Sequence, residues 1–390
     1  MNAGEERSTR APPVVSRQYD NGVSGTHRDR EKEILIADTG FSALVTAGLL
    51  DRAGFDPLLA PSPSDRSPPR VTVIWEPGLR VLDQLGLRQS VERCGTPVTE
   101  LDRTSSEKSW EADGSTEIAL VAIKRDQLRA LLEQAVRGRV RETNRAVTAL
   151  ESAASGVQAT FDHEGTESFD VAVTADQSLS ADQTAEPDGR VHTWECHQFE
   201  TTSRATESWG PSAATFSTPT GDSTSLRFVT TAETPARAAV SADAIADRFS
   251  HLNSPPADLR RVLKNGGFEY RRVRLAAPTS VSTGQIGLIG PAARTALPGT
   301  HLGPSTDIET SWSLAAAITD ASGTMTEALS SYEQRRRKLS ARFRTWLDDV
   351  QAPDLSLSPE LRLLFFARQL AFSHVTGAAH SFKHGIAADR

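Results

Sequence analysis

The clearest chemical signal in the sequence is a short turn near the start of the chain, where residues 38–43 read Asp-Thr-Gly-Phe-Ser-Ala. In the dinucleotide-binding fingerprint, the first glycine permits a tight turn, the second lets the backbone approach a pyrophosphate, and the third lets helix and strand pack closely. Gly40 stands at the second of these positions and Ala43 at the third, whereas Asp38 replaces the first glycine. Gly40, Ser42 and Ala43 are therefore candidate contacts for a dinucleotide, and a turn that binds no nucleotide is the alternative.

Other kinds of catalytic site find little support in the sequence. Two cysteines, Cys94 and Cys196, are too few for a disulfide framework or a multi-cysteine metal site. His380 and His384 are four residues apart, but nearby glycines argue against the stable helix that would bring both to one metal ion. No serine, histidine and aspartate pattern indicates a nucleophilic triad. We therefore predict no metal site and name no catalytic residue.

The elements on either side of the turn are expected to form a βαβ unit. Residues 33–37 are a short apolar run that suits a buried parallel strand. Residues 41–53 have helical spacing and end at Gly54, and residues 55–60 indicate a second strand, in which Pro57 suits the beginning better than the middle. Strand, turn, helix and strand within about thirty residues make a βαβ unit with a right-handed crossover.

The rest of the chain places strands and helices before and after a long strand-rich segment, 183–277, which contains one helix near residues 241–252. Further strands are expected from apolar runs and alternation at residues 71–75, 118–123, 285–290 and, as several short strands, within 147–176. Further helices are expected at residues 77–85, 125–136, 309–318, 324–350 and 361–375.

Five further segments carry short motifs whose order along the chain is informative. They are Trp75-Glu76-Pro77-Gly78-Leu79, Lys124-Arg125-Asp126-Gln127-Leu128, Phe169 to Gln177, Gly290-Pro291-Ala292-Ala293-Arg294 followed by Gly303, and Tyr332-Glu333 followed by Arg336. In order and spacing, over about residues 32–350, the chain resembles flavoprotein monooxygenases of the aromatic-hydroxylase type, which are related to para-hydroxybenzoate hydroxylase. Segment 124–128 resembles the family's Arg-x-x-Leu helix start, whose arginine lies near the flavin, and segment 290–294 resembles its Gly-Asp-Ala-Ala-His motif.

The resemblance implies a mixed α/β fold. A Rossmann-like, three-layer FAD/NAD(P)-binding domain would carry an inserted, mostly antiparallel substrate-type sheet and C-terminal helices. The implied division is a disordered tail (1–31), the first part of the FAD-type domain (32–182), the substrate-type sheet (183–277), the second part of the FAD-type domain (278–345) and a C-terminal helical extension (346–390).

The resemblance also implies a chemistry. FAD would be the cofactor, NAD(P)H an electron donor, and the substrate a small, largely apolar or aromatic molecule, with the difficult chemistry carried by the flavin. Besides the turn, the implied cofactor contacts are Arg125, Asp176, Gly290, Arg294 and Gly303. Two of them have a second interpretation, because an arginine at a helix start often makes a surface salt bridge and an aspartate often caps a turn. For Arg125 and Asp176 both interpretations stay open.

The sequence departs from the family where the cofactor would be touched. The family's ribityl-binding aspartate corresponds to Pro291, which has neither a side-chain acceptor nor a backbone donor, and the histidine after it corresponds to Arg294. Asp38 would place a carboxylate near a doubly negative pyrophosphate, and Ala60 and Pro61 supply no acid for the ribose. We therefore expect weakened FAD binding. The alternative is a non-catalytic descendant that binds a ligand or a partner.

Composition excludes several classes of protein. The 390 residues can bury a large core, and 38% hydrophobic with 24% charged residues suits a soluble globular chain. A formal charge of −7 argues against a surface that coats nucleic acid, and no apolar run is long enough for a membrane span or a signal core. We expect a cytoplasmic protein with a small-molecule partner, no nucleic-acid partner and no membrane span, and a homo-oligomer stays open.

Overall fold

The computed structural model describes residues 32–63, 70–105, 109–110, 120–162, 165–179, 189–198, 204–210, 213–230, 241–252, 259–275, 280–293 and 303–350. The chain divides into two units, Met1–Glu31 and Lys32–Arg390, and all described residues belong to the second. The predicted tail (1–31), the predicted contact Arg294 and the predicted helix at 361–375 lie outside the described residues.

The elements follow the chain in a mixed order of helices and strands. The described helices are α1 (Phe41–Arg52), α2 (Glu76–Gln84), α3 (Arg88–Cys94), α4 (Arg125–Val136), α6 (Ala242–Phe249), α7 (Leu259–Gly266), α8 (Gly303–Thr319) and α9 (Met325–Val350), with the single 3-10 turns η1 (Gln177–Leu179) and η2 (Gly290–Ala293). The strands up to residue 174 are β1 (Ile34–Ala37), β2 (Leu58–Ala60), β3 (Val71–Trp75), β4 (Thr96–Val98), β5 (Leu101–Ser105), β6 (Ser109–Trp110), β7 (Leu120–Lys124), β8 (Arg141–Glu142), β9 (Val147–Ala153), β10 (Gly156–Phe161), β11 (Thr166–Phe169) and β12 (Val171–Thr174). The later strands are β13 (Gly189–Gln198), β14 (Ala205–Gly210), β15 (Ala213–Pro219), β16 (Thr224–Thr230), β17 (Glu269–Leu275), β18 (Ser282–Thr283) and β19 (Ile286–Leu288).

A six-stranded sheet in the order β18-β19-β12-β1-β2-β8 holds the predicted βαβ unit. β1 pairs in parallel with β2 on one side and with β12 on the other, and β12 pairs in parallel with β19. Ile34, Leu35 and Ile36 are fully buried, as expected for a strand that is covered on both faces. The apolar run at the start of the ordered chain therefore becomes a central strand of the sheet.

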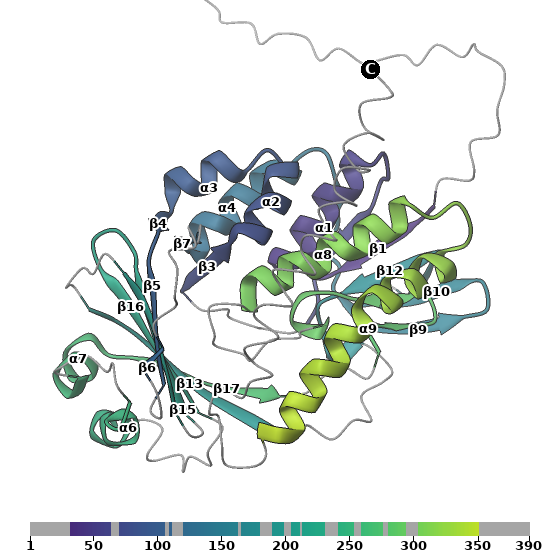
Figure 1. Cartoon of the computed structure of the whole chain (residues 1–390). Coiled ribbons are helices and arrows are strands. Elements are labelled where there is room, and N and C mark those ends of the chain that lie inside the picture. Colours follow the sequence, from purple (N-terminus) through teal and green to yellow (C-terminus); the bar gives the residue numbers. More distant parts are fainter. Residues whose placement is uncertain are drawn as a thin grey trace, which may run out of the picture. The chain divides into compact units, whose positions relative to one another are not determined.

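These parallel strands form the middle of three layers. Ile34 and Ile36 face a helical layer in which α1 and α8 pack against each other, whereas Leu35 packs with Val157 in the antiparallel sheet β11-β10-β9 on the opposite face. Figure 1 shows α1 and α8 lying side by side over the parallel strands. Alternate side chains of one strand thus enter two separate cores, because successive residues of a strand point to opposite faces.

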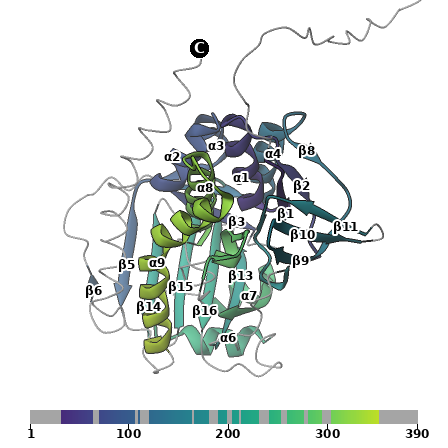
Figure 2. The same ribbon diagram turned by 90° about the vertical axis from the view of Figure 1, so that its right-hand side faces the viewer.

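A seven-stranded sheet in the order β17-β13-β16-β15-β14-β5-β6 forms the second large element. All of its neighbouring pairs are antiparallel except β14 and β5. Trp194 and Phe228 on one face pack with Phe249 of α6, and Figures 1 and 2 show α6 and α7 beside this sheet. β5 and β6 come from before residue 183, so the sheet draws on more of the chain than 183–277. The predicted α/β fold with three layers and an inserted, mostly antiparallel sheet is confirmed.

Several boundaries differ from the predictions for local reasons. α8 begins at Gly303 rather than at residue 309, since Pro304 has the fixed φ that the first turn of a helix accepts. β2 begins at Leu58, after Pro57, whose missing N–H cannot join the ladder. Two short helices, α3 and α7, were not predicted. α3 buries only Val91, which leaves no apolar periodicity, and α7 lies within a segment whose pattern is mostly strand-like.

The last described helix is tied to the parallel sheet by a buried tyrosine. The hydroxyl of Tyr332 in α9 donates to the backbone oxygen of Leu288 in β19 at 2.6 Å, and burial raises the pKa of Tyr332. Among the described helices, none combines the length and apolar character that a membrane crossing requires.

Candidate functional site

The turn between β1 and α1 places Gly40 at the N-terminus of α1 with an extended backbone, φ −75° and ψ −177°. The carboxylate of Asp38 folds back and accepts a hydrogen bond from the Gly40 N–H. A β-carbon built on Gly40 would lie 2.9 Å from Oδ1 of Asp38. The side of Gly40 that the fingerprint leaves open for a pyrophosphate therefore has a carboxylate oxygen beside it.

The predicted contacts Ser42 and Gly290 meet where α1, η2 and α8 converge. Gly290 has φ +53°, and a β-carbon there would overlap the Ser42 hydroxyl and lie 2.8 Å from Cβ of Ser42. The Gly290 N–H donates to Oγ1 of Thr310 at 2.7 Å, and Oγ of Ser311 donates to the backbone oxygen of Ser42 at 3.0 Å. Ala43, the next predicted contact, is fully buried in the same core. The structure thus brings together two segments that lie far apart in the sequence.

Gly303 is the first residue of α8, the helix that supplies Thr310 and Ser311 to this junction. A β-carbon on Gly303 would have no neighbour within 4 Å among the described contacts. The N-terminus of a helix favours negative charge through its free N–H groups and its dipole. Gly40 is the N-cap of α1 and Gly303 is the first residue of α8, so the free N–H groups at these two helix starts could face a ligand.

Asp176 lies two residues after the end of β12 and is fully buried. Its Oδ1 accepts hydrogen bonds from the N–H and the hydroxyl of Ser178, at 2.9 and 2.8 Å. Its own N–H donates to Oγ1 of Thr174 at 3.0 Å, and that hydroxyl donates to the oxygen of Ala37 at the end of β1. Asp176 therefore caps a turn, which is one of its two predicted roles. This turn lies at the carboxyl ends of β1 and β12, beside the Gly40 turn that its other predicted role, a cofactor contact, concerns.

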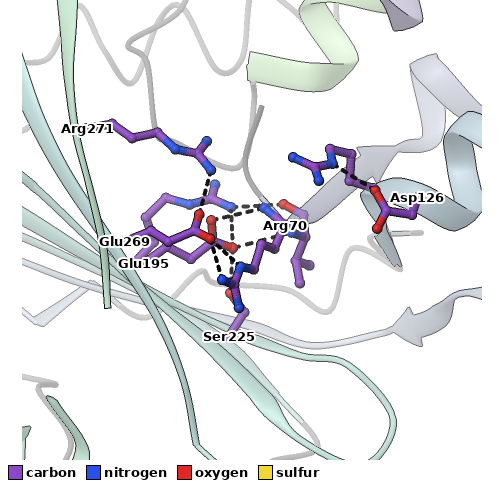
Figure 3. A network of polar contacts seen from close by, with 9 residues as sticks. Arg70, Asp126, Glu195, Ser225, Glu269 and Arg271 are labelled. Carbon is purple, nitrogen blue, oxygen red and sulfur yellow. Dashed lines mark hydrogen bonds and ion pairs between the residues drawn. The ribbon is translucent and has the colours of Figure 1, made fainter. Parts of the chain in front are cut away.

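Arg125 begins α4, as predicted, and its side chain is 29% exposed. Its Nε lies 3.0 Å from Oδ1 of Asp126, an ion pair with the next residue that Figure 3 shows. Its backbone N–H donates to the oxygen of Arg70 at 2.8 Å. The backbone bond joins Arg125 to Arg70, whose own N–H donates to Glu195 of the seven-stranded sheet.

The group to which Arg70 leads was not predicted, and we call it the Glu195 cluster (Figure 3). Its members are Arg70, Glu195, Ser225, Arg227, Glu269 and Arg271. Glu195 and Arg227 have side chains only 6% and 8% exposed, with Nη2 of Arg227 3.6 Å from Oε1 of Glu195. A signal was present in the alternation of β16, where Arg227 stands between the inward-facing Leu226 and Phe228 and must point to the other face.

Opposing effects set the pKa of Glu195. Burial works to raise the pKa, but the charge of Arg227 and the hydrogen bond from the Arg70 N–H outweigh burial, so the pKa of this carboxyl lies below its usual value. Burial also lowers the pKa of the neighbouring His197. A carboxylate and a guanidinium are therefore both charged in this buried cluster, and each needs the other because an unpaired buried charge is strongly unfavourable.

No known protein-family model matches the sequence, and no curated protein is similar to it in sequence. Solved structures are similar in fold. The tetrameric form of 2-methyl-3-hydroxypyridine-5-carboxylic acid oxygenase (MHPCO) is 18% identical with a TM-score of 0.65, covering 83% of this chain and 92% of that chain. PqsL from Pseudomonas aeruginosa, described as a probable FAD-dependent monooxygenase, is 17% identical with a TM-score of 0.63, covering 82% and 97%.

The tetracycline destructase Tet(51) is 14% identical with a TM-score of 0.58, and the match covers 87% of this chain and 97% of that chain. All three matches span most of both chains, so they concern the whole described fold and not one motif. The resemblance predicted from scattered motifs is confirmed at the level of the fold: this chain has the fold of the FAD-dependent monooxygenases.

Proposed function

We propose that this chain is an FAD-dependent, monooxygenase-like oxidoreductase that acts on a small, largely apolar or aromatic molecule and binds its cofactor weakly. The observation that carries the proposal is the position of Gly40, at a helix N-terminus on the carboxyl edge of a parallel sheet, within a fold shared with such enzymes. Ligands of open α/β sheets bind at this edge.

The backbone of the site fits a dinucleotide. The first turns of α1 and α8 would face the phosphates, and Ser42, Ala43, Gly290 and Gly303 would line them. The wider contact set of the proposal adds Arg125, Asp176 and Arg294. FAD would supply the oxidation chemistry, and NAD(P)H would reduce the FAD. The protein would bind and orient the substrate and exclude water.

Three side-chain features do not fit tight binding in the pose typical of the family. The Asp38 carboxylate accepts the Gly40 N–H, and Pro291 in η2 offers no side-chain hydrogen bond. β2 ends at Ala60 and is followed by Pro61, so neither residue supplies an acid for the ribose. At an effective dielectric constant of about 20, two unit charges about 4 Å apart repel by about 4 kcal/mol, or roughly a thousandfold in a dissociation constant. Asp38 is therefore the largest single obstacle.

The test is a titration of the full chain with FAD, followed by flavin fluorescence. Asp38→Asn keeps the shape and the acceptor for the Gly40 N–H but removes the charge, so FAD affinity should rise by about a hundredfold or more. Asp56→Asn is the control, because Asp56 is 60% exposed and pairs with Arg141 outside the site. The FAD affinity of this variant should equal that of the wild type. Failure of both the wild type and Asp38→Asn to bind millimolar FAD would defeat the flavin proposal.

The second candidate is a non-catalytic descendant that uses the same fold to bind a ligand or a partner. It is favoured by the hydrogen bond from Gly40 to Asp38, because that bond occupies an amide that the cofactor would use. The two candidates differ in substrate-stimulated oxidation of NAD(P)H in the presence of saturating FAD. An enzyme should show it, and a binding module should not.

Two further features belong to the same proposal. The chain would be divided into the FAD-type segments 32–182 and 278–345, the sheet segment 183–277 and the extension 346–390. It would also form a homo-oligomer, which sedimentation velocity will test; the MHPCO structure is described as a tetrameric form.

A further inference from the structure

The Glu195 cluster holds one short piece of backbone from several sides. Oε2 of Glu195 accepts the N–H of Arg70 at 3.1 Å, and Oε1 accepts the N–H of Val71 at 3.3 Å. Nη2 of Arg227 donates to the oxygen of Val71 at 2.9 Å. A single buried ion pair on β13 and β16 therefore engages two consecutive donors and one acceptor at the start of β3 (Figure 3).

Further contacts hold Glu195 and the edge of the cluster. Oγ of Ser225 donates to Oε1 of Glu195 at 3.2 Å. At the edge of the cluster, Glu269 accepts from Nε of Arg70 at 2.6 Å and from Nη2 of Arg271 at 2.8 Å. Buried ion pairs often contribute less stability than apolar side chains of the same volume, but they define a geometry through directional bonds. The cluster thus sets where β3 begins relative to the seven-stranded sheet.

The same backbone segment also forms a hydrogen bond with the start of α4. The first N–H groups of a helix have no acceptor within the helix. The N–H of Arg125, the first residue of α4, finds its acceptor in the oxygen of Arg70 at 2.8 Å. One residue, Arg70, therefore receives support from Glu195 at its N–H and gives support to Arg125 at its oxygen.

We propose that Glu195 is a positioning residue that fixes the start of α4, and with it Arg125, through the backbone of Arg70. The positional effect stands on the contacts alone. Its consequence for ligand binding rests on the proposed function, in which Arg125 borders the cofactor. Glu195 itself need not touch the ligand, because its carboxylate accepts the N–H of Arg70 and the oxygen of Arg70 accepts the N–H of Arg125.

The first experiment uses the full chain without any ligand. Amide hydrogen exchange is measured by mass spectrometry for the peptides that contain Val71 and Arg125. Glu195→Ala should speed exchange at both amides by about tenfold or more, whereas Glu195→Gln, which keeps an acceptor oxygen, should restore much of the protection. The control is Glu167→Gln. Glu167 lies in β11 with a side chain that is 42% exposed and pairs with Arg145, so this variant should leave both amides unchanged.

The second experiment measures coupling to Arg125. In FAD titrations, Glu195→Ala and Arg125→Ala should each weaken binding, and the double variant should bind no more weakly than Arg125→Ala alone. Additive losses would overturn the proposal, because they would mean that Glu195 acts by a route that does not include Arg125. Faster exchange at Val71 without a change at Arg125 would overturn it as well. If neither the wild type nor Asp38→Asn binds FAD, the proposed function fails, while the exchange experiment still decides the positional effect.

Discussion

Gly290→Ala is the substitution whose effect can be worked out most fully from the structure. Gly290 has φ +53°, in the left-handed region, where an L-residue is less stable by about 1–2 kcal/mol. The new β-carbon would also overlap the hydroxyl of Ser42 and lie 2.8 Å from Cβ of Ser42. Overpacking of this kind typically destabilises by about 1–3 kcal/mol. We therefore expect a loss of about 2–5 kcal/mol in the free energy of unfolding.

Gly54→Ala separates the two contributions. Gly54 lies two residues after the end of α1 with φ +90°, which is at least as unfavourable for alanine, but a β-carbon there would have no neighbour within 4 Å. This variant should lose only the conformational part, about 1–2 kcal/mol. A second comparison uses Ser42→Gly, because Gly290→Ala in that background has no side chain to overlap and should also lose only the conformational part.

Equilibrium unfolding in urea measures these losses, with the midpoint and the slope fitted separately. An unchanged slope shows that a difference in midpoint is a difference in stability. If Gly290→Ala is no less stable than Gly54→Ala, or if Ser42→Gly does not lessen the effect, the close approach of α1 and η2 is not what requires glycine.

Three further predictions follow from buried groups. Tyr332→Phe removes the donor to the oxygen of Leu288, so the free energy of unfolding in urea should fall by about 1–3 kcal/mol. The pKa of Glu195 lies below its usual value of 4.5, so the ionised carboxylate stabilises the fold above that pH, and this stabilisation is lost as the pH falls through the lower folded pKa. Between pH 6 and 3, the free energy of unfolding in urea should therefore decline less for Glu195→Gln than for the wild type. Burial raises the pKa of Cys196 to about 12, whereas Cys94 is exposed. A chromogenic thiol reagent should therefore detect one reactive thiol in the native protein and two in urea. Rapid reaction of both native thiols would contradict the burial of Cys196.

Local sequence was sufficient to predict the βαβ unit and its turn. The apolar run at residues 34–37 indicated a strand that is buried on both faces, and Gly40 marked the start of the helix after it. Both features depend on neighbours within a few residues. The same holds for Asp38, whose carboxylate lies two residues from the N–H that it accepts.

Long-range neighbours could not be predicted in this way. β12 pairs with β1 although their registered residues Ile34 and Val171 lie far apart in the chain, and Arg70 meets Glu195 across 125 positions. Such contacts depend on strand register and on how two sheets pack, and a shift of one residue in a strand would turn every side chain to the other face. Alternation could show that Arg227 points away from Leu226, but not that it faces Val71.

The sequence by itself determined the chemistry available at the turn, which is a glycine at a helix start with a carboxylate two residues before it and few partners for a ribose or a ribityl chain. The tertiary structure alone decided which distant residues share that region. It placed Gly290 against Ser42, and it joined Arg125 to the Glu195 cluster through Arg70. The physical reason is that residue type and local spacing set a group's hydrogen-bonding capacity and backbone conformation, whereas its partners across the fold are set by the packing of helices and sheets.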